Sequence, residues 1–235
     1  SMRINKYIAS CAGYSRRKSE ELVLSGRIKI NNEITRDLST QVSESDKVYL
    51  DGKLITLQKF VYYALNKPVG YTTTTSDPHA KKLITELVPK DPPVFPVGRL
   101  DKNTSGLIFL TNDGDFAQKM THPKYEKEKE YIVETNKPLS ASSLESLREG
   151  IELDDGMTAP AKVTSLCHSR EGGNPDHKNN LYSITIHEGK NRQIRRMVEK
   201  VGAKVMALKR IRIGDFELGD LKESEYQIFT QNQSK

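Results

Sequence analysis

The residues with the clearest capacity for chemistry lie at positions 98–114, where one carboxylate stands among cations. Asp101 follows Arg99 closely and directly precedes Lys102. The apolar run at 107–110 predicts a buried strand that would hold this segment in place. Aspartate is also common in turns for local hydrogen-bonding reasons, so the residues alone leave a purely structural role for Asp101 open.

A second concentration of charge lies at 189–212, where nine cations stand against Glu199 alone. The spacing predicts a helix over 191–201 whose apolar stripe consists of Ile194, Met197, Val198 and Val201. Its other face would then carry Arg192, Arg195 and Arg196. Guanidinium groups this close together need an anionic neighbour, either RNA-type phosphates or a buried carboxylate such as Asp101. A solvated charged face is the alternative.

The N-terminal quarter must position a further group of cations. Segments 3–12 and 16–24 predict two short helices, the first ended by Gly13 and the second capped by Ser15. The second helix begins with Arg16, Arg17 and Lys18, although a helix N-terminus favours anions. A phosphate backbone at this position would use both the amide groups and the cations, whereas a solvated surface offset by later glutamates is the alternative.

Composition narrows the class of protein. The 235 residues contain 37 Lys and Arg against 31 Asp and Glu, giving a net charge of +6, which favours a polyanionic partner. No stretch approaches the roughly 18 apolar residues that a membrane span requires, so we expect a cytoplasmic protein. Cys11 and Cys167 lie far apart without neighbouring ligands, which predicts neither a disulfide framework nor a zinc site.

The remaining segments predict alternating strands and helices around these charges. Tyr131 opens a strand, where its ring could face a cleft, although a place in the core is the default for tyrosine. The mixed charges at 126–130 predict a solvated segment, and 167–180 predicts a long polar loop. Further strands are expected at 27–33, 46–50, 61–65 and 182–186, and further helices at 115–120 and 140–149.

Three N-terminal segments closely resemble the S4 RNA-binding domain. They are 3–9 (RINKYIA), 15–22 (SRRKSEEL) and 26–31 (GRIKIN). The resemblance covers about the first quarter of the chain and implies binding to structured RNA, without implying catalysis.

Four later segments resemble the bacterial ribosomal RNA pseudouridine synthases of the small-subunit type. They are 66–71 (NKPVGY), 98–107 (GRLDKNTSGL), 129–131 (KEY) and 188–197 (EGKNRQIRRM). The resemblance implies an α+β architecture, with an S4 domain at 2–58 and a catalytic domain at 59–235. It further implies a mixed, mainly antiparallel β-sheet flanked by helices in the catalytic domain.

The resemblance also implies roles for individual residues. Asp101 would attack or deprotonate the target ribose, so that uracil leaves, rotates and rejoins through carbon 5. Tyr131 would stack on the flipped-out base, and Arg195 would pair with Asp101, with Arg192 as the other candidate. A base inside a helix must be flipped out before it can react, and an arginine partner keeps a carboxylate ionised and aimed. The reaction is redox-neutral, so we expect no cofactor and no metal.

Ribosomal RNA is the implied partner of a monomeric enzyme. The surroundings of 153–156 (LDDG) favour large-subunit (23S) RNA, and small-subunit (16S) RNA remains the alternative. A non-catalytic RNA-binding assembly factor on the same fold is a second alternative, and a metal-dependent RNA-cleaving hydrolase is disfavoured because Asp101 has no second carboxylate or histidine nearby. The expected RNA contacts are Arg3, Lys6, Arg16, Arg17, Lys18, Arg27, Lys67, Arg99, Arg192, Gln193 and Arg196.

Overall fold

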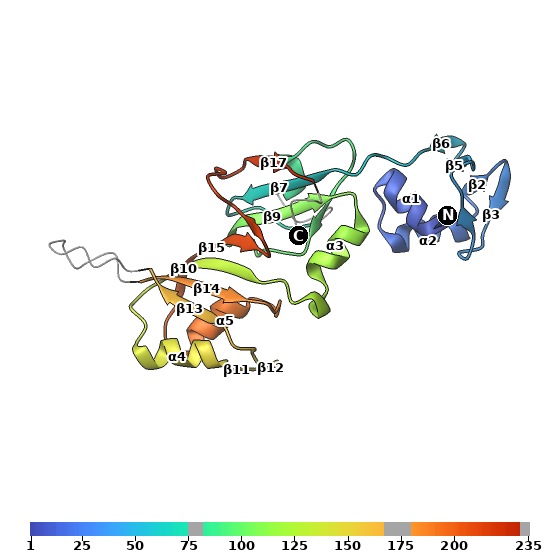
Figure 1. The fold of residues 1–235 in the computed structure, drawn as a ribbon. Helices are drawn as coiled ribbons and strands as arrows, with labels where there is room; N and C mark the ends of the chain where they lie inside the picture. The colour runs from blue at the N-terminus through green and yellow to red at the C-terminus, as the bar shows by residue number, and fades with distance from the viewer. Residues whose placement is uncertain (75–81, 167–179, 231–235) are drawn as a thin grey trace.

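The chain folds into two lobes of unequal size, joined by an extended segment (Figure 1). The computed structural model describes residues 1–74, 82–166 and 180–230. The loop expected at 167–180, with Cys167, therefore lies almost wholly outside the described residues. In the part of the chain that is described, no helix has the length and apolar character needed to span a membrane.

The N-terminal lobe packs two helices on a small sheet and has its own core. Gly13, at φ +67°, ends the first helix as expected, and the Ser15 hydroxyl accepts a hydrogen bond from the Lys18 amide at 3.2 Å at the start of the second. The buried core includes Ile8, Val23 and Ile28. The elements are β1 (Met2–Arg3), α1 (Ile4–Ala12), α2 (Arg16–Leu24), β2 (Ile28–Ile30), β3 (Glu33–Thr35), β4 (Gln41–Val42), β5 (Val48–Leu50) and β6 (Lys53–Ile55).

The larger lobe is organised by one sheet with the order β13-β14-β10-β15-β9-β7-β17. In addition, β8 pairs with β9 and β16 pairs with β15. Among the described strands, all neighbours are antiparallel except β15 and β9. The strands are β7 (Tyr62–Lys67), β8 (Phe95–Val97), β9 (Ser105–Thr111), β10 (Lys129–Thr135), β13 (Lys162–Ser165), β14 (Leu181–Ile186), β15 (Val205–Ile213), β16 (Phe216–Glu217) and β17 (Tyr226–Ile228).

Helices cover this sheet and create two apolar cores. One core receives Leu147 from α4 (Ala141–Glu149) and Met197 from α5 (Gln193–Lys200). The other is rich in aromatic rings and receives Phe116 from α3 (Gly114–Thr121). Short elements complete the lobe: η1 (Ile84–Leu87), η2 (Pro123–Tyr125) and the ribbon of β11 (Glu152–Leu153) with β12 (Gly156–Met157). The expected α+β class with a mixed, mainly antiparallel sheet is confirmed.

The charge run at 126–130 differs from the expectation of a solvated segment. Its second half enters β10, where the Arg212 guanidinium pairs with Glu130 at 2.9 Å and with Glu128 at 3.1 Å. Lys162 adds a second cation to Glu128 at 2.6 Å. These cations come from β15 and β13, far along the chain, which a pattern confined to the run could not reveal.

The N-terminal lobe touches the larger lobe near the start of α3. Asp115 accepts the Lys6 ammonium at 2.6 Å and lies 3.8 Å from the Arg16 guanidinium. Close to this ion pair, Gly13 approaches Pro93 so tightly that a Cβ at Gly13 would lie 2.6 Å from the proline ring. Two of the expected RNA contacts therefore also hold the lobes together.

Candidate active site

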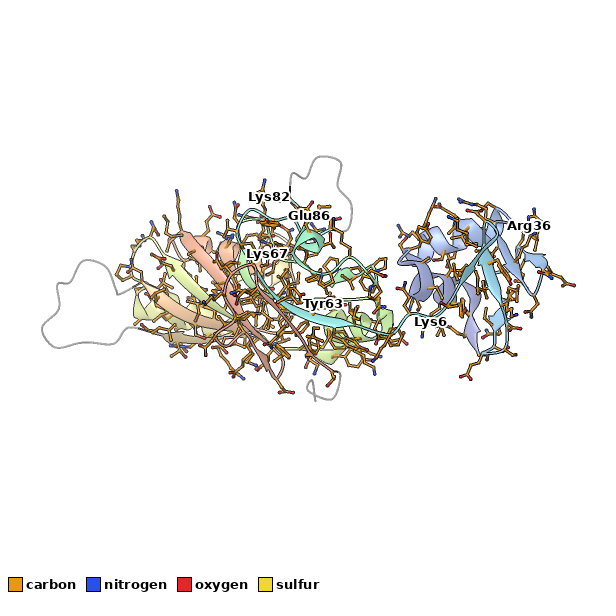
Figure 2. The ribbon with its side chains drawn as sticks, turned by 90° about the horizontal axis from the view of Figure 1, so that it is seen from above. Lys6, Arg36, Tyr63, Lys67, Lys82 and Glu86 are labelled. Carbon is orange, nitrogen blue, oxygen red and sulfur yellow. The ribbon has the colours of Figure 1, made fainter. Side chains whose placement is uncertain are left out.

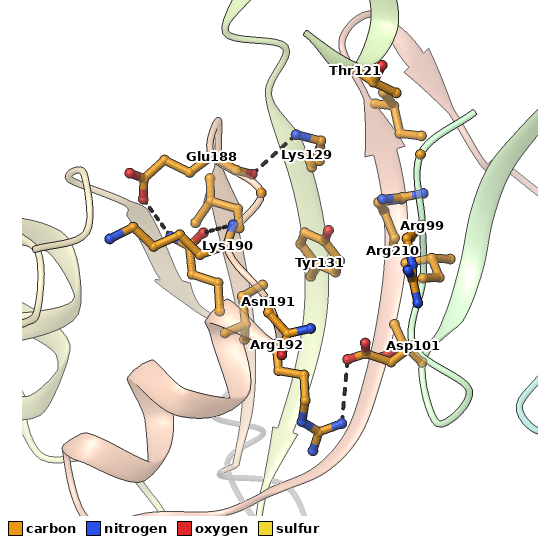
Figure 3. Close-up of a pocket in the computed structure, with 18 of the residues that line it drawn as sticks. Arg99, Asp101, Thr121, Lys129, Tyr131, Glu188, Lys190, Asn191, Arg192 and Arg210 are labelled. Carbon is orange, nitrogen blue, oxygen red and sulfur yellow. Dashed lines mark hydrogen bonds and ion pairs between the residues drawn. The ribbon is translucent and has the colours of Figure 1, made fainter. Parts of the chain in front are cut away.

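A cavity of about 390 Å³ opens where the loop before β9, strands β10 and β15, and the turn before α5 meet. Its lining includes the charged groups Arg99, Asp101, Lys129, Arg192 and Arg210, with the ring of Tyr131 between them (Figure 3). The two sequence segments that the pattern singled out, around 101 and around 192, thus meet in one cavity.

Asp101 forms an ion pair with Arg192, at 3.6 Å between Oδ2 and Nη1. The Asp101 side chain is 32% exposed, so the carboxylate remains accessible from the cavity. Helix α5 begins at Gln193, and Arg192 precedes it with a left-handed backbone at φ +48°. This conformation, uncommon for a residue other than glycine, places Arg192 outside the helix rather than on the predicted face.

Arg195 occupies a different position from the one expected. Its guanidinium donates to the backbone oxygen of Asn103 at 2.8 Å and reaches the Thr104 hydroxyl at 3.4 Å, both in the loop that follows Asp101. Its Nε is buried and has no hydrogen-bond partner among the described residues. Burial, with Arg192 beside it, lowers the pKa of Arg195. The ion pair with Asp101 therefore comes from Arg192, because Arg195 lies one turn further along and faces the loop backbone.

Glutamine variants of the two arginines should separate the orientation of the Asp101 carboxylate by Arg192 from the stabilisation of its loop by Arg195. We expect Arg192→Gln to lower kcat by about 10–100-fold with little change in Tm, because its side chain is half exposed and its contact is the carboxylate. Arg195→Gln should lower Tm as well, by several degrees, because it removes donors from the Asn103 and Val205 backbone oxygens and leaves a partly buried contact between α5 and the loop unmade. Turnover assays beside thermal unfolding measure both effects; equal losses of Tm in the two variants would contradict this division.

Tyr131 is 8% exposed and still lines the cavity. Its side chain is therefore both part of the core and a wall of the cleft, which the sequence had left as alternatives. The Arg210 guanidinium lies 6.0 Å from the centre of its ring, within cation–π range. Arg210 itself is buried and donates from Nε to the Leu107 backbone oxygen at 2.8 Å. Sequence reasoning missed Arg210; alternation along 205–213 was the available signal, but it does not tell which face meets the cavity.

Lys67 does not face RNA, contrary to expectation. It ends β7, all of whose residues are buried, and lies within the body of the larger lobe (Figure 2). Its ammonium donates to the backbone oxygens of Pro68 at 3.0 Å, Lys102 at 3.4 Å and Thr104 at 2.7 Å. Lys67 therefore braces the loop that carries Asp101, from the side opposite the cavity-lining Arg192.

The titration of Lys67 should be visible in stability. Burial is the main cause that lowers its pKa from 10.5 to about 8, with Asp101 opposing and Arg210 adding to the shift. Between pH 8 and 10.5 the Lys67 side chain of the unfolded protein binds more protons than that of the folded protein. The buried charge therefore destabilises the folded state fully below pH 8, and this destabilisation decreases as the pH rises. We expect the stability of the wild type, relative to Lys67→Met, to increase by on the order of 3 kcal/mol from pH 7.5 to 10.5.

Urea unfolding of both proteins across this pH range measures the difference. Lys162→Met is the matched control, because that side chain is 76% exposed and its removal should leave no such trend. A wild-type advantage over Lys67→Met that stays constant with pH would contradict the lowered pKa.

Two further expected RNA contacts, Gln193 and Arg196, instead bind other residues of the same chain. Gln193 is buried and donates from Nε2 to Glu188 at 2.7 Å, and its own oxygen accepts from the Lys190 amide at 3.2 Å. Arg196 binds Asp155 through both terminal nitrogens, at 2.8 and 3.0 Å. These contacts fix the turn into α5 and the β11–β12 ribbon, so the motif at 188–197 is largely a scaffold for Arg192 and Arg195.

The other expected RNA contacts lie on the surface. Arg99 is exposed at the mouth of the cavity, and Arg3, Arg16 and Arg17 are exposed on the N-terminal lobe. Lys18 pairs with Glu21 at 2.8 Å, and Arg27 forms a two-point contact with Asp51. Exposed pairs of this kind are weak, so phosphates can compete for these cations. Among the described residues, no group of three or more His, Cys, Asp or Glu is placed to hold a metal ion.

Comparison with known proteins decides the family. The model of the RNA pseudouridylate synthases matches residues 61–200, and that of the S4 domain matches residues 2–48. The chain belongs to the RNA pseudouridylate synthase family. The family, the S4 domain and the enzyme class expected from the sequence are thereby confirmed. The pseudouridylate synthase model spans the loop of Asp101, the strand of Tyr131 and the turn of Arg192.

Full-length relatives support this membership. An uncharacterized RNA pseudouridine synthase of Aquifex aeolicus is 41% identical over 99% of this chain and 92% of its own length. The ribosomal large subunit pseudouridine synthase B of Bacillus subtilis is 37% identical over 99% of this chain and 94% of its own length. A crystal structure of a pseudouridylate synthase matches with a TM-score of 0.68 and 32% identity, covering 99% of this chain and 98% of the other.

Proposed function

We propose that this pseudouridine synthase acts on a specific uridine of ribosomal RNA, with large-subunit RNA as the favoured substrate. The observation that carries the proposal is the meeting of Asp101, Tyr131 and Arg192 in one cavity that is large enough for a nucleotide base. The name of the similar Bacillus subtilis enzyme supports large-subunit RNA. A dual-specificity RNA pseudouridine synthase of Escherichia coli, 34% identical over 99% of this chain and 77% of its own length, is a further relative.

In the proposed reaction, each group acts on one part of a flipped-out nucleotide. Stacking on Tyr131 offsets part of the cost of removing the base from its helix. Asp101, aimed by Arg192, attacks or deprotonates the ribose, so that the bond from C1′ to N1 breaks and a bond from C1′ to C5 forms. C5 then loses its proton and N1 gains one, which completes the isomerisation. Arg195 and Lys67 donate hydrogen bonds to backbone oxygens of the loop that carries Asp101, which makes them positioning residues.

We further propose a division into an S4 domain at 2–58 and a catalytic domain at 59–235. The separate core of the N-terminal lobe and the positions of the two family models support it. In this arrangement Arg3, Arg17 and their neighbours grip structured RNA while the larger lobe receives the uridine. The monomeric state and the cytoplasmic location stay predictions from the sequence.

Mapping of pseudouridine in ribosomal RNA tests the proposed substrate. RNA from a deletion strain should lack one modification, and the purified protein should restore it in the isolated transcript. Loss in large-subunit RNA would support the favoured substrate, and loss in small-subunit RNA would redirect it. An unchanged pattern in both RNAs, together with inactivity on both transcripts, would refute ribosomal RNA as the substrate.

A further inference from the structure

Lys129 lines the cavity but has no part in the proposed reaction so far. It opens β10 two residues before Tyr131, so both side chains project from the same side of the strand. Within the described residues its ammonium makes one hydrogen bond, to the Glu188 backbone oxygen at 3.2 Å, and no ion pair. An ammonium group has three donors. The other two are therefore available to an acceptor in the cavity.

The positive charge on Lys129 is energetically unfavourable in the folded protein. Burial, with Arg210 as a second cause, lowers its pKa to about 8, and no carboxylate compensates it within the described chain. A partly buried cation without an acidic partner is unfavourable in an empty cavity. An oxygen acceptor on a bound ligand would recover part of this cost.

The position of Lys129 indicates which ligand oxygen it meets. Lys129 and Asp101 lie on opposite sides of the Tyr131 ring along the cavity (Figure 3). A uridine with its ribose at Asp101 and its base stacked on Tyr131 thus directs the edge of the base toward Lys129. In uracil that edge carries the carbonyl oxygen at C4, whereas cytosine presents an amino donor there; the oxygen at C2 is common to both bases. Lysine can only donate, so the two bases are treated differently.

We propose that Lys129 donates a hydrogen bond to the C4 carbonyl oxygen of the target uracil and makes the site specific for uracil over cytosine. The inference rests on the proposed function. Lys129 also borders a second cavity of about 540 Å³, where the RNA backbone could offer a phosphate oxygen instead. The experiment must therefore separate a base oxygen from a phosphate oxygen.

Matched changes in protein and RNA test this contact. The substrates are RNA hairpins of ribosomal sequence that carry uridine, 2-thiouridine or 4-thiouridine at the target, because sulfur is a weaker acceptor than oxygen. A further hairpin carries a phosphorothioate beside the target uridine. The proteins are the wild type, Lys129→Met and Lys162→Met, the last as an exposed-lysine control. We expect Lys129→Met to lower kcat/KM on uridine RNA by about 10–100-fold. The 4-thio substitution should lower the wild-type value about tenfold and leave Lys129→Met within about twofold, whereas the 2-thio substitution should affect both proteins alike.

The outcomes discriminate between roles. If Lys129 has only a structural role, Lys129→Met lowers kcat/KM by the same factor on the uridine hairpin and on both thiouridine hairpins. The variant and the wild type are then equally sensitive to the thio substitutions, and that result would overturn the inference. If Lys129→Met loses its sensitivity to a phosphorothioate beside the target but not to the thio bases, Lys129 contacts a phosphate. That result would also overturn the inference. If the wild type fails to convert uridine RNA, the proposed function falls, and this inference falls with it.

Discussion

Asp101→Asn is expected to reduce pseudouridine formation by about 10⁴-fold or more, because asparagine can serve neither as nucleophile nor as base. The substitution preserves size, and the side chain is partly exposed, so folding should be unaffected. RNA binding should remain within about twofold, because the surface cations of the N-terminal lobe are unchanged. Quantification of pseudouridine after single turnover, beside a filter-binding titration, measures both properties.

The exposed Asp220 provides a matched control, since Asp220→Asn makes the same chemical change outside the cavity. Its turnover should equal that of the wild type. Undiminished turnover in Asp101→Asn would rule out the proposed role of this carboxylate. Loss of RNA binding together with turnover would instead indicate that Asp101 shapes the RNA surface, and would leave its chemical role without support.

The sequence singled out Asp101 but left its ion-pair partner open between Arg195 and Arg192, and the structure pairs it with Arg192. Asp101 stands out because it is a lone acid among cations on a loop before a buried strand. The choice between Arg192 and Arg195 depends on a backbone turn at φ +48°, which arginine rarely adopts and which no side-chain pattern encodes. An amphipathic pattern places both residues on one helical face, whereas the helix begins only after Arg192.

Cations were equally difficult to classify as surface or interior. Lys67 follows a strand in a Pro-Gly segment, which suggests an accessible mouth, yet it satisfies carbonyls up to 37 residues away. Lys129 and Arg210 lie on strands whose inward face is determined by pairing across the sheet. Local periodicity predicts elements well, but the surroundings of a charged side chain depend on contacts between distant segments.

Gly106→Ala is expected to destabilise the protein by about 4 kcal/mol. Gly106 has φ +105° and lies opposite Arg210, where β9 and β15 run parallel. An added Cβ would lie 2.1 Å from the Arg210 backbone oxygen, which forces the two strands apart. Because the loop of Asp101 leads directly into β9, turnover should fall as well. Urea unfolding and single-turnover assays measure the two losses.

Gly70→Ala separates backbone strain from steric overlap. Gly70 has φ +95° and no atom within 4 Å of an added Cβ, so only the strain of about 1–2 kcal/mol applies. The Gly106 variant should therefore lose clearly more stability than the Gly70 variant. Equal losses would show that the strands tolerate the extra methyl group and that their close approach is not required.

The placement of β15 has a consequence for synthesis of the protein. This strand, Val205–Ile213, lies between β10, which carries Tyr131, and β9, which follows the loop of Asp101. Until it has been inserted, the strand of Tyr131 and the strand that follows the loop of Asp101 have no common neighbour in the sheet. A nascent chain therefore acquires its catalytic pocket in one late step, after residue 213 has been translated. Shorter translation products would carry the S4 lobe without a complete cavity.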